Sequence, residues 1–192
     1  MPNRVVIVAG SPGAGKTTLI KGLASNPNVK IANMGTLMLE IAKRDGLADD
    51  RDKMRLLSND RISALRDRAF AEVAAMKGHI VVDTHATVEA NGRYVPGIPV
   101  EQVGRIKALR ALVYIDSLTD DILERRKLDR SRDRESEDKI RIDDQRQINM
   151  SILSVISSSL NIPLYIIFNR QGRLEEGIAA LKANVEEIFS EK

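Results

Sequence analysis

The strongest constraint on the fold is a glycine-rich segment, Gly10-Ser11-Pro12-Gly13-Ala14-Gly15-Lys16-Thr17, which directly follows the apolar run Val5–Ala9. It matches the pattern G-x-x-x-x-G-K-[ST], whose glycines permit backbone conformations that aim successive N–H groups at one anionic group. A helix that starts at Lys16 would add the positive end of its dipole at the same point. The segment therefore predicts a buried strand, a phosphate-binding loop and a helix in direct succession.

The chemistry of this loop indicates a nucleoside triphosphate. Lys16 can reach the β- and γ-phosphates, and the Thr17 hydroxyl can ligate Mg²⁺. A chance glycine turn beside a lysine is the alternative, but the strand and helix on either side favour the phosphate loop. We predict that Lys16 is also catalytic. The predicted ATP-binding residues are Gly10, Ser11, Pro12, Gly13, Ala14, Gly15, Lys16, Thr17 and Thr18.

Five short stretches predict buried strands, because they are apolar throughout, as in sheets covered on both faces. They are Val5–Ala9, Lys30–Met34, His79–Asp83, Leu112–Asp116 and Leu164–Phe168. Between them lie segments with helical periodicity. Their apolar stripes are Ile62, Leu65, Ala69, Val73 and Met76; Ile148, Ile152, Val155 and Ile156; and Leu174, Ile178, Leu181, Val185 and Ile188. Alternating strands and helices predict a three-layer α/β fold with a parallel sheet.

Length and composition limit the number of domains and the classes of protein that fit this chain. A chain of 192 residues, 43% hydrophobic and 30% charged, predicts one domain over 1–192 that needs no disulfide or metal for its stability. It has no cysteine, which excludes a thiolate metal site. No apolar run approaches the roughly 18 residues of a membrane span, and Val5–Ala9 is too short for a signal peptide. We therefore expect a cytoplasmic protein without a membrane partner.

Two segments interrupt the alternation of strands and helices. The segment 91–99 is rich in glycine and proline, which predicts a loop after the third strand. The segment 125–138 is almost wholly charged, and the chain has seven arginines between Arg125 and Arg146. A solvated helix face is the ordinary interpretation of such a run. Because this run follows the fourth strand, on the side of the phosphate loop, an arginine-rich lid is equally well supported.

Arginines in that segment have a possible role in phosphoryl transfer. The reaction spreads negative charge over the transferred group, and guanidinium groups bind phosphate bidentately. Arg125, Arg132 and Arg134 are therefore predicted to close over the phosphates as catalytic residues. The alternative is pairing with neighbouring acidic side chains on the surface, which would contribute little to stability.

Asp83 ends the apolar strand at 79–83. A carboxylate at the carboxyl end of a buried strand beside a P-loop suits Mg²⁺, either directly or through water. Capping of the following turn is the alternative role. His85 stands two residues later, and a structural role and a substrate-binding role are equally open for it. We include His85 among the substrate-binding candidates and assign His79 to structure.

Together these motifs resemble the archaeal adenylate kinases, a branch of the P-loop nucleoside monophosphate kinases. The matching segments are 10–17, 49–55 with Leu57-Ser58, 82–86, 94–99 and the arginine lid at 125–134. The resemblance runs nearly end to end. It implies the reaction ATP + AMP ⇌ 2 ADP with Mg²⁺ and a five-stranded P-loop NTPase fold with strand order 2-3-1-4-5. It also implies a segment that binds the nucleoside monophosphate at about 35–77, a short lid at about 125–138, and a homo-oligomer, a trimer.

The chain departs from the widespread bacterial and eukaryotic adenylate kinases in its acceptor site. Their Thr-Gly-Asp-x-x-Arg is replaced by residues 34–39, and their Asp-Gly-Phe-Pro-Arg by residues 83–87, so both AMP-binding arginines are missing. Arg51 and Arg55 follow the second strand and stand four residues apart, so one helix face could carry both. We predict that these two arginines bind the acceptor phosphate instead.

Three other functions fit the sequence less well. Shikimate and thymidylate kinases carry an Asp-x-Arg signature that residues 34–39 lack. A GTPase switch would need Asn-Lys-x-Asp, and residues 169–172 contain no such aspartate. A nucleic-acid-associated ATPase would use the basic stretch at 125–146, but acidic residues interrupt that stretch and the net charge is only +3. We therefore expect no nucleic-acid partner.

Overall fold

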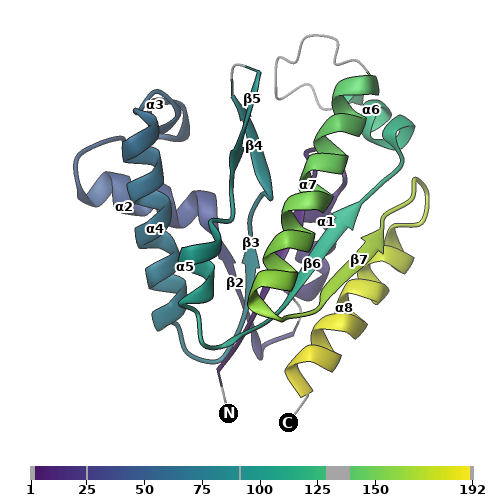
Figure 1. Ribbon diagram of the computed structural model, residues 1–192. Helices are drawn as coiled ribbons and strands as arrows, with labels where there is room; N and C mark the ends of the chain where they lie inside the picture. Colours follow the sequence, from purple (N-terminus) through teal and green to yellow (C-terminus); the bar gives the residue numbers. More distant parts are fainter. Residues whose placement is uncertain (1–2, 25, 91, 129–138, 191–192) are drawn as a thin grey trace.

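The computed structural model describes residues 3–24, 26–90, 92–128 and 139–190. Its centre is a five-stranded parallel sheet. The strands are β1 (Arg4–Gly10), β2 (Val29–Asn33), β3 (His79–Asp83), β6 (Leu109–Asp116) and β7 (Leu164–Phe168). Their spatial order is β2-β3-β1-β6-β7 (Figure 1), which is the predicted order 2-3-1-4-5 when the strands of this sheet are counted alone. All five predicted strands are confirmed.

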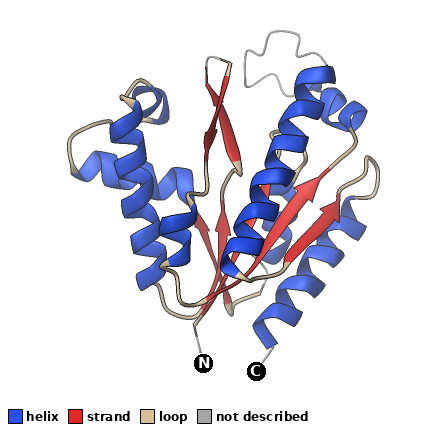
Figure 2. Ribbon diagram, viewed as in Figure 1, coloured by secondary structure: helices blue, strands red, loops and turns tan. Residues whose placement is uncertain are grey.

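Helices cover both faces of the sheet, as predicted (Figure 2). The first face is covered by α1 (Lys16–Leu23) and α8 (Leu174–Ser190), and the second by α2 (Met34–Arg44), α4 (Asn59–Ala75), α5 (Val100–Gly104) and α7 (Lys139–Leu160). Val6 and Val8 of β1 face the first layer, and Val5 and Ile7 face the second. Side chains alternate along a strand, so this one strand contributes to both cores.

The remaining elements lie at the end of the molecule toward which the central strands run (Figure 1). They are α3 (Arg51–Arg55), α6 (Thr119–Leu128) and the two antiparallel strands β4 (Thr87–Ala90) and β5 (Arg93–Pro96). The prediction of a loop over 91–99 was therefore wrong for β5. The glycines and prolines of this segment are residues that usually interrupt strands, so the sequence predicted a loop. The strand forms because Val95 pairs with Val88 of β4, and the sequence alone does not reveal this pairing.

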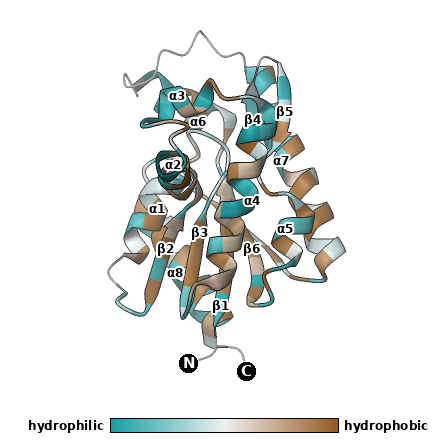
Figure 3. Cartoon of the chain, turned by 90° about the vertical axis from the view of Figure 1, so that its left-hand side faces the viewer, coloured by the Kyte–Doolittle hydropathy of each residue, from teal (hydrophilic) through white to brown (hydrophobic). Residues whose placement is uncertain are grey.

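The longest helix, α7, also differs from its prediction. The side chains that it buries are Ile142, Gln145, Asn149, Leu153 and Ile156. Of the predicted stripe, Ile156 is buried, whereas Val155 is 63% exposed. Apolar residues are visible along this helix in Figure 3. The apolar periodicity of this segment was misleading because two polar residues, Gln145 and Asn149, occupy buried positions of the helix. Within the described ranges, neither α7 nor any other helix is long and apolar enough to cross a membrane.

Candidate nucleotide-binding site

The glycine-rich segment forms a loop between β1 and α1. Gly13 and Gly15 have φ angles of 89° and 86°, in the left-handed region that other residues rarely adopt. A side chain at Gly15 would also collide with the amide of Asn169, which donates from Nδ2 to the Ala14 carbonyl (2.8 Å). Because α1 begins at Lys16, its first N–H groups lie at the end of this loop. The loop thus has the geometry expected of an anion-binding site.

Lys16 forms a buried ion pair with Asp83 beside this loop. Asp83 ends β3, where it is in register with Val8 of β1 and Asn33 of β2. Its other carboxylate oxygen accepts a hydrogen bond from Asn33 Nδ2 (2.7 Å). The Lys16 and Asp83 side chains are only 8% and 7% exposed. Burial of either charge alone would cost several kcal/mol, so each charge stabilises the other.

Arg125, a predicted lid residue, lies on α6 and contacts the P-loop directly. Its guanidinium donates to the Ser117 hydroxyl (3.0 Å), the Asn169 carbonyl (3.1 Å) and the Gly13 carbonyl (3.4 Å). These acceptors come from the ends of β6 and β7 and from the loop itself. Arg125 is therefore a fixed part of the site's edge, with a side chain 19% exposed.

Arg126, which the sequence analysis did not single out, makes the closer contact. Its Nε and Nη2 atoms both donate to the Pro12 carbonyl, at 2.8 and 2.6 Å. In the sequence it is one arginine in a charged run, and only the helix geometry distinguishes it. Arg132 and Arg134, the other predicted lid residues, lie outside the described residues.

A buried hydrogen-bond network connects the P-loop to the start of β4. The Ser11 hydroxyl bonds to the Tyr114 hydroxyl (3.1 Å) and accepts from Asn149 Nδ2 (3.0 Å). Asn149 Oδ1 in turn accepts from the Thr87 hydroxyl (2.6 Å). Burial raises the pKa of Tyr114, so this phenol stays protonated. Residues from three elements, β6, α7 and β4, are thus fixed relative to the loop, and none of these contacts has a sequence signal.

A second ion pair, between Arg146 and Asp116, lies at the carboxyl end of β6. Asp116 at the end of β6 accepts two hydrogen bonds from the Arg146 guanidinium, both at 2.8 Å. Arg146 also donates to Asp143 (2.9 Å) and the Thr119 hydroxyl (3.0 Å). The hydrogen bonds that Arg146 donates to Asp116 raise the pKa of Arg146 above its ordinary value. These contacts attach α7 to the carboxyl ends of the central strands.

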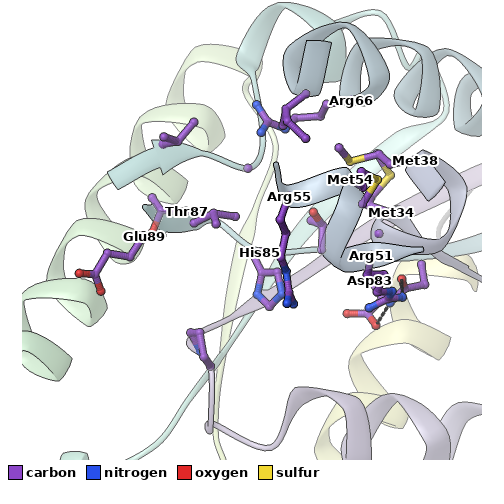
Figure 4. A pocket seen from close by; sticks show the side chains of 18 of the residues that line it. Met34, Met38, Arg51, Met54, Arg55, Arg66, Asp83, His85, Thr87 and Glu89 are labelled. Carbon is purple, nitrogen blue, oxygen red and sulfur yellow. Dashed lines mark hydrogen bonds between the residues drawn. The ribbon is translucent and has the colours of Figure 1, made fainter. Parts of the chain in front are cut away.

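A cavity of about 630 Å³ opens next to Lys16 and Asp83. Its wall comes from α2, α3, α4, the segment after β3, and the β4–β5 pair. Part of the lining is apolar, namely Met34, Met38, Met54, Leu57, Ile62 and Val95. Side chains from α2, α3 and α4 converge on this space in Figure 4. The cavity is large enough for a small organic substrate.

Three further predicted residues lie on this wall, namely Arg51, Arg55 and His85. Arg51 donates to the Thr36 hydroxyl (3.1 Å). Arg55 pairs with Asp52 (2.9 Å), and both side chains are largely exposed. Figure 4 shows His85 beside Arg55. The structure therefore brings the three predicted substrate-binding residues to the same cavity as Lys16 and Asp83.

Comparison with known proteins first defines the class. A family model described as an AAA domain matches residues 9–143. Solved structures with a similar fold include shikimate kinases from Acinetobacter baumannii and Aquifex aeolicus. The first has a TM-score of 0.60 at 14% identity, and the alignment covers 100% of this chain and 96% of that chain. The second has a TM-score of 0.58 at 15% identity, and the alignment covers 95% of this chain and 96% of that chain. At such identities the likeness concerns the fold alone. The chain is an α/β protein with the P-loop NTPase fold.

Comparison with curated relatives then defines the family. Adenylate kinase from Methanoculleus marisnigri is 35% identical over 185 residues, which cover 93% of this chain and 96% of the relative. Adenylate kinase from Thermoplasma acidophilum is 34% identical over 169 residues, which cover 87% of this chain and 90% of the relative. Adenylate kinase from Methanocaldococcus jannaschii is 33% identical over 189 residues, which cover 94% of this chain and 97% of the relative. The chain belongs to the adenylate kinase family, in agreement with the resemblance found from its motifs.

Proposed function

We propose that this protein is an adenylate kinase that catalyses ATP + AMP ⇌ 2 ADP with Mg²⁺ in the cytoplasm. The observation that carries the proposal is a single cavity that joins the P-loop lysine to arginines of α3 and α4. A phosphate donor bound on the loop and a phosphate acceptor bound by these arginines would meet near Lys16 and Asp83. The name adenylate kinase, which the relatives carry, supports the same assignment.

On the donor side, the loop and the start of α1 would bind the phosphates of ATP through their N–H groups. Lys16 would exchange its contact with Asp83 for one with the γ-phosphoryl group. Arg125, which already lies on the loop, would stabilise the charge that spreads over this group in the transition state. We propose the same role for Arg132 and Arg134 in a lid over 125–138.

Thr17 and Asp83 are the candidate Mg²⁺ ligands. Asp83 stands beside the P-loop, and Thr17 is exposed in the first turn of α1. Hydroxyl and carboxylate oxygens are hard ligands of the kind that Mg²⁺ prefers, so the donor set fits the ion. When bound, the ion would neutralise negative charge on the transferred phosphate. Movement of Lys16 to the phosphates would make the Asp83 oxygen that it now contacts available.

On the acceptor side, the segment 35–77 supplies α3, α4 and most of α2 to the cavity wall. We propose that it binds AMP, with Arg51 and Arg55 at the phosphate and His85 beside them. A dianionic phosphate needs compensating charge in a partly dehydrated site. Both arginines would exchange their present side-chain partners for the phosphate.

The test is a panel of separate reactions, each with ATP, Mg²⁺ and one nucleoside monophosphate. We expect AMP to yield ADP faster than GMP, CMP or UMP is phosphorylated. A Lys16→Ala preparation, purified in the same way, controls for contaminating kinases. Equal rates with every acceptor, or no product from AMP, would contradict the proposal.

We also propose that the protein is a homotrimer, as the family resemblance implies. Leu164 of the edge strand β7 packs in the core on the α7 side, and alternation places Ile166 and Phe168 on that side too. These two side chains are 53% and 45% exposed, and Val155 of the adjacent α7 is 63% exposed. Such an apolar surface beside an edge strand favours contact with a second copy of the chain.

The mass of the protein in solution, measured by light scattering after gel filtration, tests this proposal. We expect three times the chain mass for the wild type and a smaller mass for the double variant Val155→Lys, Ile166→Lys. Leu56→Lys is the matched control, because Leu56 is 86% exposed and directly follows α3, which lies far from β7 in Figure 1. A wild-type monomer would contradict the proposal.

A further inference from the structure

Arg66 lies in the wall of the cavity. It is on α4, one turn after Ile62, and both side chains line the cavity. Within the part of the chain that the structure describes, its guanidinium has no hydrogen-bond acceptor and no ion-pair partner. Burial lowers the pKa of Arg66, and the charge of neighbouring Asp67 only partly opposes this effect. Arg66 thus presents unused donors to the cavity.

The other arginines of the cavity are all engaged. Arg51 and Arg55 bond to neighbouring side chains, and Arg126 bonds to the P-loop backbone. A guanidinium has several N–H donors and no acceptor. The guanidinium nitrogens of Arg66 reach solvent, so water can satisfy them, and a ligand with suitable acceptors could take the place of that water. The free donors of Arg66 therefore point to a ligand rather than to a structural role.

The position of Arg66 indicates which part of a ligand it would contact. In Figure 4, Arg66 lies away from both Asp83 and His85, and Arg55 extends between Arg66 and His85. The acceptor phosphate must lie near Asp83 and Lys16 for transfer, so the nucleoside would extend toward Arg66. Met38 also lines the cavity, and a thioether packs well against a flat ring.

We propose that Arg66 donates hydrogen bonds to the base of the acceptor nucleotide and so contributes to the affinity for this substrate. The inference rests on the proposed acceptor function. Because a guanidinium only donates, Arg66 can bind the ring nitrogens of adenine but not its exocyclic amino group. A phosphate contact is the less favourable alternative, since Arg51 and Arg55 lie closer to the transfer site in Figure 4.

The experiment compares AMP with adenosine, which has the base but no phosphate. Dissociation constants of both are measured calorimetrically for the wild type, Arg66→Met and Arg55→Ala. We expect Arg66→Met to weaken both ligands by a similar factor of about ten. Arg55→Ala should weaken AMP and leave adenosine unchanged, because only AMP carries the phosphate. ATP binding should be unchanged in both variants.

A second measurement identifies the contact itself. AMP analogues in which one ring nitrogen is replaced by carbon are tested against the wild type and Arg66→Met. The analogue that lacks the accepting nitrogen should bind more weakly than AMP to the wild type but not to the variant. Arg61→Met is the matched control, because Arg61 is exposed on the same helix outside the cavity.

Three outcomes are decisive. Equal losses of AMP and adenosine with one analogue coupled to Arg66 would support the proposal. Unchanged adenosine affinity in Arg66→Met would overturn it, and so would the same losses in Arg61→Met. Failure of the wild type to form ADP from AMP would instead contradict the proposed function, while the adenosine result would still test Arg66.

Discussion

The two ends of the cavity are built in different ways. At the donor end, a backbone loop is fixed by glycine geometry, and the side chains around it are buried and hydrogen-bonded to one another. At the acceptor end, arginines from α3 and α4 project from helices, are partly or largely exposed, and have either a surface partner or none. The donor end is therefore pre-organised, whereas the acceptor end would acquire its contacts from the substrate.

This difference has a physical basis. Backbone N–H groups are the same in every residue, so a loop of fixed shape can bind phosphate with little dependence on the rest of the fold. Discrimination of one base or one phosphate from another needs specific side chains, which separate segments must bring together. Substitutions at the donor end should accordingly disturb catalysis or folding most, and those at the acceptor end should change the affinity for one substrate.

The largest effect is expected for Lys16→Ala. We propose that Lys16 contacts the γ-phosphoryl group in the transition state, so loss of this cation should lower kcat about a thousandfold, about 4 kcal/mol. The variant leaves the Asp83 charge buried with its hydrogen bond from Asn33, so we expect a less stable protein that still folds. Turnover is measured together with circular dichroism. A folded variant that retains more than a tenth of the wild-type kcat would remove this lysine from the mechanism.

Gly15→Ala tests the rigidity of the donor end. The left-handed φ and the displacement of Asn169 together should lower the free energy of unfolding by about 3 kcal/mol. Gly46→Ala is the matched control, since Gly46 also has a positive φ of 67° but no atom within 4 Å of the added group. It should lose only about 1 kcal/mol. Equal losses in urea denaturation would mean that packing against Asn169 is unimportant.

Asp83→Asn separates metal binding from nucleotide binding. Replacement of a carboxylate ligand by an amide should raise the Mg²⁺ concentration for half-maximal activity about thirtyfold, within the range seen for altered metal sites. Affinity for ATP should change less, because the loop is intact. Activity is titrated with Mg²⁺ at fixed ATP. An unchanged titration curve would restrict Asp83 to its structural contacts with Lys16 and Asn33.

Arg55→Ala tests the acceptor end, where the smallest effect is expected. The KM for AMP should rise at least roughly tenfold, about 1.4 kcal/mol, and the KM for ATP should change little. The alternative is that Arg55 serves only its exposed pair with Asp52, which would be worth less than about 1 kcal/mol. Asp52→Ala separates the two, because it removes the pair and leaves the arginine. Parallel shifts of both KM values would mean that the acceptor site lies elsewhere.

Much of the donor end could be predicted from the sequence. The P-loop residues are contiguous, and Asp83 is marked by its place at the end of an apolar strand. Asn33, Arg126 and Asn149 could not be found in this way, because each meets the loop or Asp83 only when folding brings distant segments together. Their neighbours in the chain carry no pattern that distinguishes them from surface residues.

The sequence by itself determined the features that depend on local order, namely the P-loop, the five sheet strands and the placement of Arg51 and Arg55 after the second strand. The periodicities of strands and helices are local properties, so they can be recognised in a run of consecutive residues. Only the tertiary structure decided that β4 and β5 pair, that Gln145 and Asn149 of α7 face inward, and that Arg66 reaches the cavity. These outcomes depend on which surfaces meet across the fold, and contacts between distant segments leave no periodic signal in either one.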